Sequence, residues 1–129
     1  TLSQELQFIQ SYYHLLKTRY GDSLQVHMQI EDSYLDYQLP PLTLQMLVEN
    51  AVKHNRMMKD FPLRITLKNS GDKLIVVNNL QRKVRQVSSN KIGLGNIAKK
   101  YKLLEQEDIL VRDDGREFAV VIPLIRNKE

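Results

Sequence analysis

The chain of 129 residues lacks several features that particular classes of protein require. It has no cysteine, which excludes disulfides, cysteine nucleophiles and thiolate metal sites and is consistent with a reducing cytoplasm. No run approaches the roughly 20 apolar residues of a membrane span, and no signal peptide opens the sequence. Repeats and low-complexity tracts are also absent. We therefore expect this fragment to be soluble as it stands.

Length and composition favour one domain, 1–129, because a chain of this size with 42% hydrophobic residues buries one sizeable core. The sequence starts with Thr1 rather than Met, so we expect a fragment of a longer protein. The net charge of the chain is +4, and basic residues gather at 82–85 and 91–102. Since no nucleic-acid module is recognisable, nucleotide phosphates or a solvated face explain these charges better, and we expect no nucleic-acid partner.

Hydrophobic periodicity predicts the order of the elements. An apolar stripe at helical spacing predicts an N-terminal helix within 1–21, with a Thr1–Gln4 capping box and a stop at Gly21. Alternating or continuous apolar runs predict strands at 24–30, 63–67, 73–77, 109–111 and 118–122. The acidic stretch 31–36 reads as a loop or an irregular strand. The sum is a two-layer α/β sandwich with a mixed sheet and helices on one face.

Residues 39–55 predict a helix with a polar stripe beside an apolar face, entered at Pro40 and Pro41. Asn50, Lys53 and His54 recur at helical spacing on that stripe. An asparagine oxygen suits Mg²⁺ and the other two side chains supply positive donors, which together suit a metal-bound polyphosphate. The alternative is a half-buried helix whose polar residues meet solvent, with Glu49 and Lys53 forming an ordinary ion pair.

A second polar element, 91–104, reads as a glycine turn followed by a helix. Gly93 and Gly95 permit positive φ and close approach of a ligand to the backbone. Free N–H groups at the start of a helix would then bind phosphate. The alternative is a plain turn, because a single pair of glycines is a weak signal.

Between these elements, the apolar run 74–80 predicts a buried strand that ends near Asn78. The Asn78 amide can exchange hydrogen bonds with adenine, although an Asx turn is the commoner role of such a residue. The stretch 80–92 is polar and lacks periodicity. Its place between the Asn78 strand and the glycine turn favours a lid over a bound ligand, against the alternative of an ordinary connecting loop.

In this order the three elements resemble the N box and the two glycine boxes of the GHKL ATPase superfamily, which includes histidine kinases, gyrase, Hsp90 and MutL. Residues 40–54, 92–97 and 118–124 look like those of a LytS-type sensor histidine kinase. The resemblance covers nearly the whole chain. It implies the GHKL (Bergerat) ATPase fold, ATP and Mg²⁺ as cofactors, and histidine kinase activity.

The resemblance also assigns roles to individual residues. It makes Asn50 the Mg²⁺ ligand, Lys53 and His54 phosphate contacts, and Asn78 the adenine contact. The expected nucleotide-binding set is Asn50, Lys53, His54, Asn78, Lys91, Gly93, Leu94, Gly95 and Asn96. The expected catalytic set is Glu49, Lys53 and His54. The role of Glu49 stays open between orienting water and pairing with Lys53, because it points about 100° away from Asn50 around a helix.

Four residues depart from the superfamily pattern. Asn78 stands where most members carry Asp, which removes a charge and predicts weaker or less selective nucleotide binding. Leu80 and Arg82 stand where glycines usually follow, so the start of the lid should be less pliable. Lys91 replaces a glycine of the second glycine box, which removes backbone freedom and adds a cation. We expect these departures to change nucleotide affinity more than they change the fold.

As a mechanism, the resemblance implies transfer of the γ-phosphate of ATP to a histidine on an upstream dimerisation helix, with a cognate response regulator as the next partner. Two histidines lie outside the N box: His14, expected to be a partly buried helix residue, and His27, expected to be exposed on a strand. Neither has the Pro-His-Phe context of a phosphoacceptor. We therefore expect this fragment to bind nucleotide without labelling itself.

The resemblance further implies a homodimer in the full-length protein and a cytoplasmic domain attached to an inner-membrane sensor. Two alternatives remain open. One is a degenerate GHKL module that serves as a non-catalytic dimerisation or docking domain. The other is a different GHKL enzyme, such as an anti-sigma serine kinase, whose N box is similar.

Overall fold

The computed structural model describes residues 1–81, 89–104 and 108–126, with the backbone alone at 89–94. Its helices are α1 (Leu2–Tyr20), α2 (Thr43–His54) and α3 (Ser89–Leu103), with short 3₁₀ turns at η1 (Gly21–Ser23) and η2 (Asp32–Tyr34). Its strands are β1 (Leu24–Gln29), β2 (Leu63–Ser70), β3 (Lys73–Asn79), β4 (Leu110–Asp113) and β5 (Glu117–Pro123).

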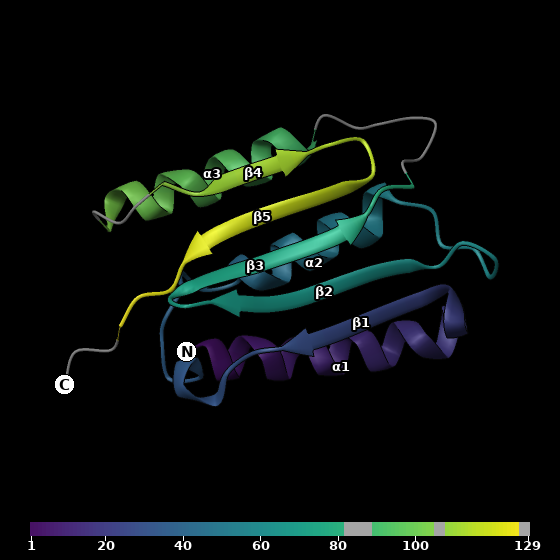
Figure 1. Cartoon of the computed structure of the whole chain (residues 1–129), viewed down its shortest axis with the longest axis horizontal. Helices are drawn as coiled ribbons and strands as arrows, with labels where there is room; N and C mark the ends of the chain where they lie inside the picture. The colour runs from purple at the N-terminus through teal and green to yellow at the C-terminus, as the bar shows by residue number, and fades with distance from the viewer. Residues whose placement is uncertain (82–88, 105–107, 127–129) are drawn as a thin grey trace.

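The five strands form one mixed sheet in the order β1-β2-β3-β5-β4. The pair β1 and β2 is parallel, and the other neighbouring pairs are antiparallel. All three helices lie against the same face of the sheet, with α2 between α1 and α3 (Figure 1). The predicted two-layer α/β sandwich is therefore confirmed.

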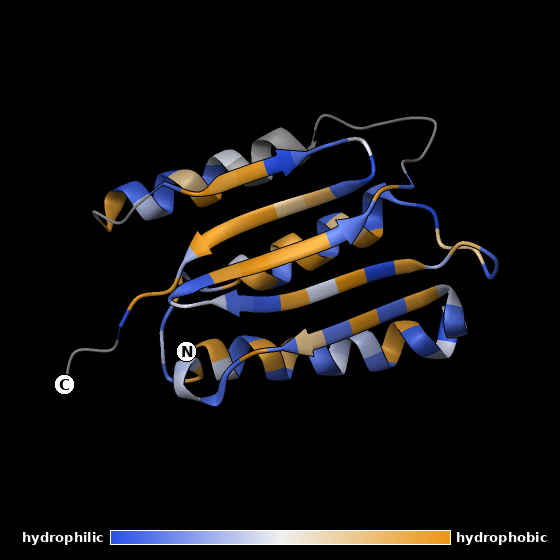
Figure 2. Ribbon diagram, in the orientation of Figure 1, coloured by the Kyte–Doolittle hydropathy of each residue, from blue (hydrophilic) through white to orange (hydrophobic). Residues whose placement is uncertain are grey.

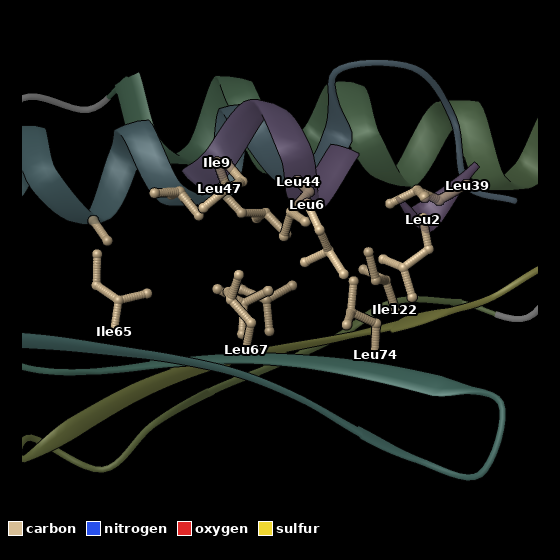
Figure 3. Packing of buried hydrophobic residues seen from close by; sticks show 14 of the residues in the cluster. Leu2, Leu6, Ile9, Leu39, Leu44, Leu47, Ile65, Leu67, Leu74 and Ile122 are labelled. Carbon is tan, nitrogen blue, oxygen red and sulfur yellow. The ribbon is translucent and has the colours of Figure 1, made fainter. Parts of the chain in front are cut away.

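The core lies between the helices and the sheet (Figure 3). Its helical side chains point down onto leucines and isoleucines that rise from the strands. The labelled members are Leu2, Leu6, Ile9, Leu39, Leu44, Leu47, Ile65, Leu67, Leu74 and Ile122. Because each buried side chain of this size stabilises the fold by about 1.5–3 kcal/mol, this layer fixes α1 and α2 on the sheet.

Helix α1 has the bounds that its apolar stripe predicts. The predicted capping box is present: the Thr1 hydroxyl accepts a hydrogen bond from the Gln4 backbone N–H at 3.3 Å, and the N-terminal ammonium donates to Gln4 Oε1 at 2.8 Å. Gly21 ends the helix with a φ of 58°, a conformation that glycine adopts without strain. These local signals are sufficient to set both ends of α1.

The strands differ in how their side chains alternate. Strands β1 and β2 alternate between apolar and polar residues, whereas β3 and β5 are apolar over most of their length (Figure 2). Strand β3 lies between β2 and β5, so side chains of both neighbouring strands shield its outer face from solvent. Because of this shielding, Ile75 and Val77 on the outer face are half-buried rather than exposed. Leu74 and Val76 on the other face are buried under the helices.

The start of α2 differs from the prediction. The helix begins at Thr43, two residues after the expected entrance at Pro40 and Pro41. Proline pushes the residue before it into extended backbone, and Leu42 adopts a left-handed conformation with a φ of 65° that breaks the helix. Leu42 provides no side-chain cap. The Glu5 carboxylate of α1 instead accepts the Leu44 backbone N–H at 3.3 Å.

The predicted glycine turn is wrong. Helix α3 starts at Ser89 and runs through Gly93 and Gly95, and the described glycines with positive φ lie elsewhere in the chain. Glycine costs about 1 kcal/mol relative to alanine inside a helix. Burial of Ile97 and Tyr101, each 1% exposed, outweighs that cost. Of the expected lid, 82–88 lie outside the described residues, and 89–92 belong to α3.

The two histidines outside α2 are both exposed. This contradicts the expected partial burial of His14, because Tyr13 faces the core and the next residue is rotated by about 100° toward solvent. The expected exposure of His27 on β1 is confirmed. In the described ranges, no helix combines the length and the apolarity that crossing a bilayer needs.

Candidate functional site

Helix α2 carries the predicted polar stripe along the border of its core face. Leu47 and Val48 point into the core, with 5% and 1% exposure. Beside them Asn50 is half-buried, Lys53 is exposed, and His54 is buried at 8% exposure. The stripe therefore includes one residue in solvent, Lys53, and one in the protein interior, His54, while the carboxamide of Asn50 lies at the boundary between solvent and interior.

Glu49 points toward α1 rather than along this stripe. Its carboxylate accepts a hydrogen bond from the Gln45 side-chain amide at 3.1 Å. Burial raises the pKa of Tyr12 on α1, and the negative charge of Glu49 raises that pKa further. Among the described residues, Glu49 thus pairs with Gln45, and the alternative ion pair with Lys53 is absent. Glu49 and Asn50, about 100° apart, face different neighbours.

Asn78 lies near the end of β3 and is 4% exposed. It pairs across the sheet with the fully buried Ile65, so its side chain lies on the face that the helices cover. Its amide donates a hydrogen bond to the Asn79 backbone carbonyl at 2.8 Å. This contact differs from an Asx turn, in which the side-chain oxygen accepts from a backbone N–H two residues later.

Three segments that are distant in sequence reach the same end of the molecule. The C-terminal end of α2, the end of β3 and the start of α3 all lie toward the right of Figure 1. Helix α2 contacts both β3 and α3. The fold therefore brings the stripe of α2, the buried Asn78 and the start of α3 to the same end of the sheet.

Hydrogen bonds that the sequence did not predict connect two of these segments. Asn55, directly after α2, accepts the Gln81 backbone N–H on its side-chain oxygen at 2.9 Å. The Arg56 backbone N–H donates to the Gln81 carbonyl at 2.7 Å. Asn55 and Gln81 are 26 residues apart. No local pattern indicates such a contact, which depends on the positions of α2 and β3.

The predicted residues on α3 are only partly described. Lys91, Gly93 and Leu94 are described as helical backbone. Gly95 and Asn96 are exposed, and a Cβ added at Gly95 would meet nothing within 4 Å. On the side of Gly95, the surface of α3 therefore faces solvent.

The donor set is suited to a nucleotide-bound metal rather than to a metal held by protein alone. Within the described ranges, no three His, Cys, Asp or Glu side chains cluster as metal ligands. Mg²⁺ typically takes one or two protein oxygens and completes its shell with substrate phosphates and water. One half-buried carboxamide, Asn50, beside a lysine and a histidine fits that mode of binding.

Curated relatives include two proteins named LytS. The chain is 29% identical over 84 residues to the sensor protein LytS of Oceanobacillus iheyensis, covering 62% of this chain and 14% of that protein. It is 41% identical over 54 residues to the sensor histidine kinase/phosphatase LytS of Staphylococcus aureus, covering 42% of this chain and 9% of that protein. The chain thus spans a small part of the length of these relatives. No family model matches.

Solved structures with the same fold include two histidine kinases. The nucleotide-free catalytic domain of histidine kinase ThkA superimposes with a TM-score of 0.63 at 14% identity, covering 97% of this chain and 95% of that one. Acinetobacter baumannii histidine kinase AdeS gives a TM-score of 0.55 at 11% identity, covering 94% of this chain and 64% of that one. At these identities the likeness shows a shared fold.

Proposed function

We propose that this chain, which has the fold of histidine kinase catalytic domains and is similar in sequence to LytS-type sensor kinases of the GHKL superfamily, binds Mg-ATP and serves phosphotransfer to histidine. The acceptor would be a histidine on an upstream dimerisation helix of the same kinase. A cognate response regulator would receive the phosphoryl group next. In the full-length protein, a homodimeric inner-membrane sensor, this domain would lie on the cytoplasmic side.

The observation that carries the proposal is the convergence of α2, β3 and α3 at one end of the sheet. A nucleotide there would meet Asn78 at its base and the stripe of α2 at its phosphates. Asn50 would hold Mg²⁺, which when bound neutralises phosphate charge. Lys53, exposed beside that residue, would attract and orient the phosphates, and His54 would contact them from its buried position.

The remaining residues play supporting roles in this proposal. Glu49 is held by Gln45 and faces α1, so we assign it to keeping α2 in place rather than to orienting water. Backbone N–H groups of the first turn of α3, which have no partner within the helix, would contact phosphate from the opposite side. Catalysis would rest on positioning and charge neutralisation, as is usual for phosphoryl transfer.

Two observations favour the non-catalytic alternative. The Asn78 amide is already bonded to the Asn79 carbonyl, and α3 is helical through both glycines of the expected turn. A domain that had lost nucleotide binding would show the same arrangement. Thermal unfolding with and without Mg-ADP separates the two functions, because a ligand selective for the folded state raises the melting temperature.

The proposed function predicts a rise in melting temperature that increases with Mg-ADP concentration and disappears when EDTA replaces Mg²⁺. No rise at millimolar Mg-ADP would favour the docking module. Phosphotransfer itself needs the longer protein: incubation with radiolabelled ATP should label an upstream histidine of that protein, and not this fragment.

A further inference from the structure

We propose that Asn55 is a positioning residue that sets the distance between the adenine side and the phosphate side of the nucleotide site. The inference rests on the proposed function and adds to it a residue outside the expected binding set. Asn55 occupies the first position after α2, where the helix carrying Asn50 and His54 ends. Its side chain is hydrogen-bonded to Ala51 and Gln81, neither of which belongs to the set assigned to nucleotide.

Asn55 is 4% exposed and connects two chain segments through its side chain. Its amide donates to the Ala51 carbonyl at 2.9 Å, which holds the last turn of α2. Its oxygen accepts the Gln81 N–H at 2.9 Å, which holds the chain that leaves β3. Both hydrogen-bonding groups of one buried carboxamide are therefore used, one on each segment.

The segment that Asn55 binds is fixed at further points. The Gln81 carbonyl accepts the Arg56 N–H at 2.7 Å, and the Gln81 side-chain amide donates to the Pro62 carbonyl at 3.3 Å. Asn79 donates to the same Pro62 carbonyl at 3.0 Å. The end of β3 is thus tied to the end of α2 and to the start of β2. Among these hydrogen bonds, the one from the Gln81 N–H to the Asn55 side chain joins the end of α2 to the chain that leaves β3.

This tie has a functional consequence because Asn50 and Asn78 lie on the two segments that it joins. A ligand that spans two subsites gains affinity from their fixed spacing, and loses that gain when the spacing varies. Adenosine needs only the Asn78 side, whereas Mg-ADP needs both sides. Loosening the tie should therefore weaken Mg-ADP far more than adenosine.

Asn55→Ala removes the side-chain contacts, and Asn69→Ala is a matched control. Asn69 also uses its oxygen on a distant backbone N–H, that of Glu31 at 2.9 Å, and its amide on a backbone carbonyl, that of Gly71 at 3.0 Å. It lies near the opposite end of β2. Affinities for Mg-ADP and for adenosine are measured by NMR titration below the melting temperature of each protein.

For Asn55→Ala we expect Mg-ADP affinity to fall by about tenfold or more while adenosine affinity stays within about twofold. For Asn69→Ala, both affinities should stay within about twofold of wild type. An equal loss for both ligands in Asn55→Ala, or a loss for neither, overturns the positioning role.

A second measurement avoids the variants and remains informative if Asn55→Ala fails to fold. If the tie sets the spacing that the nucleotide needs, binding must strengthen the tie by the same coupling free energy. Hydrogen exchange at the Gln81 and Arg56 amides should then slow more with Mg-ADP than with adenosine at equal saturation. Equal slowing with the two ligands contradicts the inference.

The two proposals fail in different ways. If wild type binds Mg-ADP but the ratio of affinities is unchanged in Asn55→Ala, the positioning role is wrong and the proposed function stands. If wild type ignores Mg-ADP, both are wrong.

Discussion

Helices α2 and α3 flank the candidate site but are held on the sheet in different ways. Helix α2 is anchored at its start by the Glu5 carboxylate and at its end by Asn55, and it buries Leu44 completely. The described anchors of α3 are Ile97 and Tyr101, both in its C-terminal half. One side of the proposed site is therefore fixed by hydrogen bonds and packing along the whole of α2, while for α3 the side chains that the structure describes provide buried contacts in its C-terminal half.

The contacts of α2 and β3 fix Asn50 and Asn78, which we propose as the metal and adenine contacts, before any ligand binds. Helical backbone at 89–96 uses its own N–H groups for the helix beyond the first turn. Substitutions in α2 should accordingly affect stability most, and those near the start of α3 least. The predictions below test this ranking.

The largest effect is expected from Leu44→Ala in α2. Leu44 is 0% exposed, so truncation should lower the free energy of unfolding by about 2–5 kcal/mol through lost burial and a cavity. Urea unfolding measures the change. Leu103→Ala at the end of α3 is the control, because Leu103 is 84% exposed and should change stability by less than about 0.5 kcal/mol. Similar losses of unfolding free energy in Leu44→Ala and Leu103→Ala would contradict the expectation that α2 contributes more to stability at these positions than α3.

The next effect concerns binding rather than stability. Asn50→Ala should lower ATP affinity in the presence of Mg²⁺ by about tenfold or more and abolish the difference between Mg²⁺ and EDTA, because the only proposed protein ligand is lost. Calorimetric titration measures both affinities. Asn50→Asp retains an oxygen ligand and should retain the Mg²⁺ dependence. A Mg²⁺ dependence that survives in Asn50→Ala excludes this residue as the metal ligand.

Tyr101→Phe tests the anchor of α3. The Tyr101 hydroxyl donates to the Pro123 carbonyl at 2.8 Å, so we expect a loss of about 1 kcal/mol in the free energy of unfolding. Burial raises the pKa of Tyr101 above its usual value of 10.0, so the protonated donor is favoured in the folded state. That contribution is complete below the unfolded pKa and decreases as pH rises above it. The difference between variant and wild type should therefore shrink above about pH 10; a constant difference would contradict it.

Gly95→Ala should produce the smallest effect, and it should be stabilising. An added Cβ meets nothing within 4 Å, and alanine favours helix over glycine by about 0.5–1 kcal/mol. Thermal unfolding without nucleotide measures it. A destabilised variant would indicate positive φ at this residue, as the glycine-turn prediction had it.

Sequence patterns predicted the elements whose signals are local. The bounds and caps of α1 were predictable because the stripe, Thr1, Gln4 and Gly21 lie within one segment. The stripe of α2 was predictable because helical spacing alone places Asn50, Lys53 and His54 together. The start of α2 was not, since it depends on a left-handed Leu42 and on a carboxylate from α1.

The contacts that hold the candidate site together were the least predictable. Glu5 and Leu44 are 39 residues apart, and Asn55 and Gln81 are 26 apart. Each pair forms only after helices and strands have packed. The prediction of a glycine turn at 93–95 was wrong although its signal was local. Burial of Ile97 and Tyr101 farther along the same helix outweighed the local preference of glycine for a turn.

A titration of isotope-labelled protein with Mg-ADP, followed by backbone amide chemical shifts, tests the central claim most directly. If α2, β3 and α3 together bind one nucleotide, the largest shifts will fall at 50–56, 78–81 and 89–96, and the turn at 70–73 will stay unchanged. Shifts confined to one of these segments, or centred on the turn at 70–73, would contradict a shared nucleotide site.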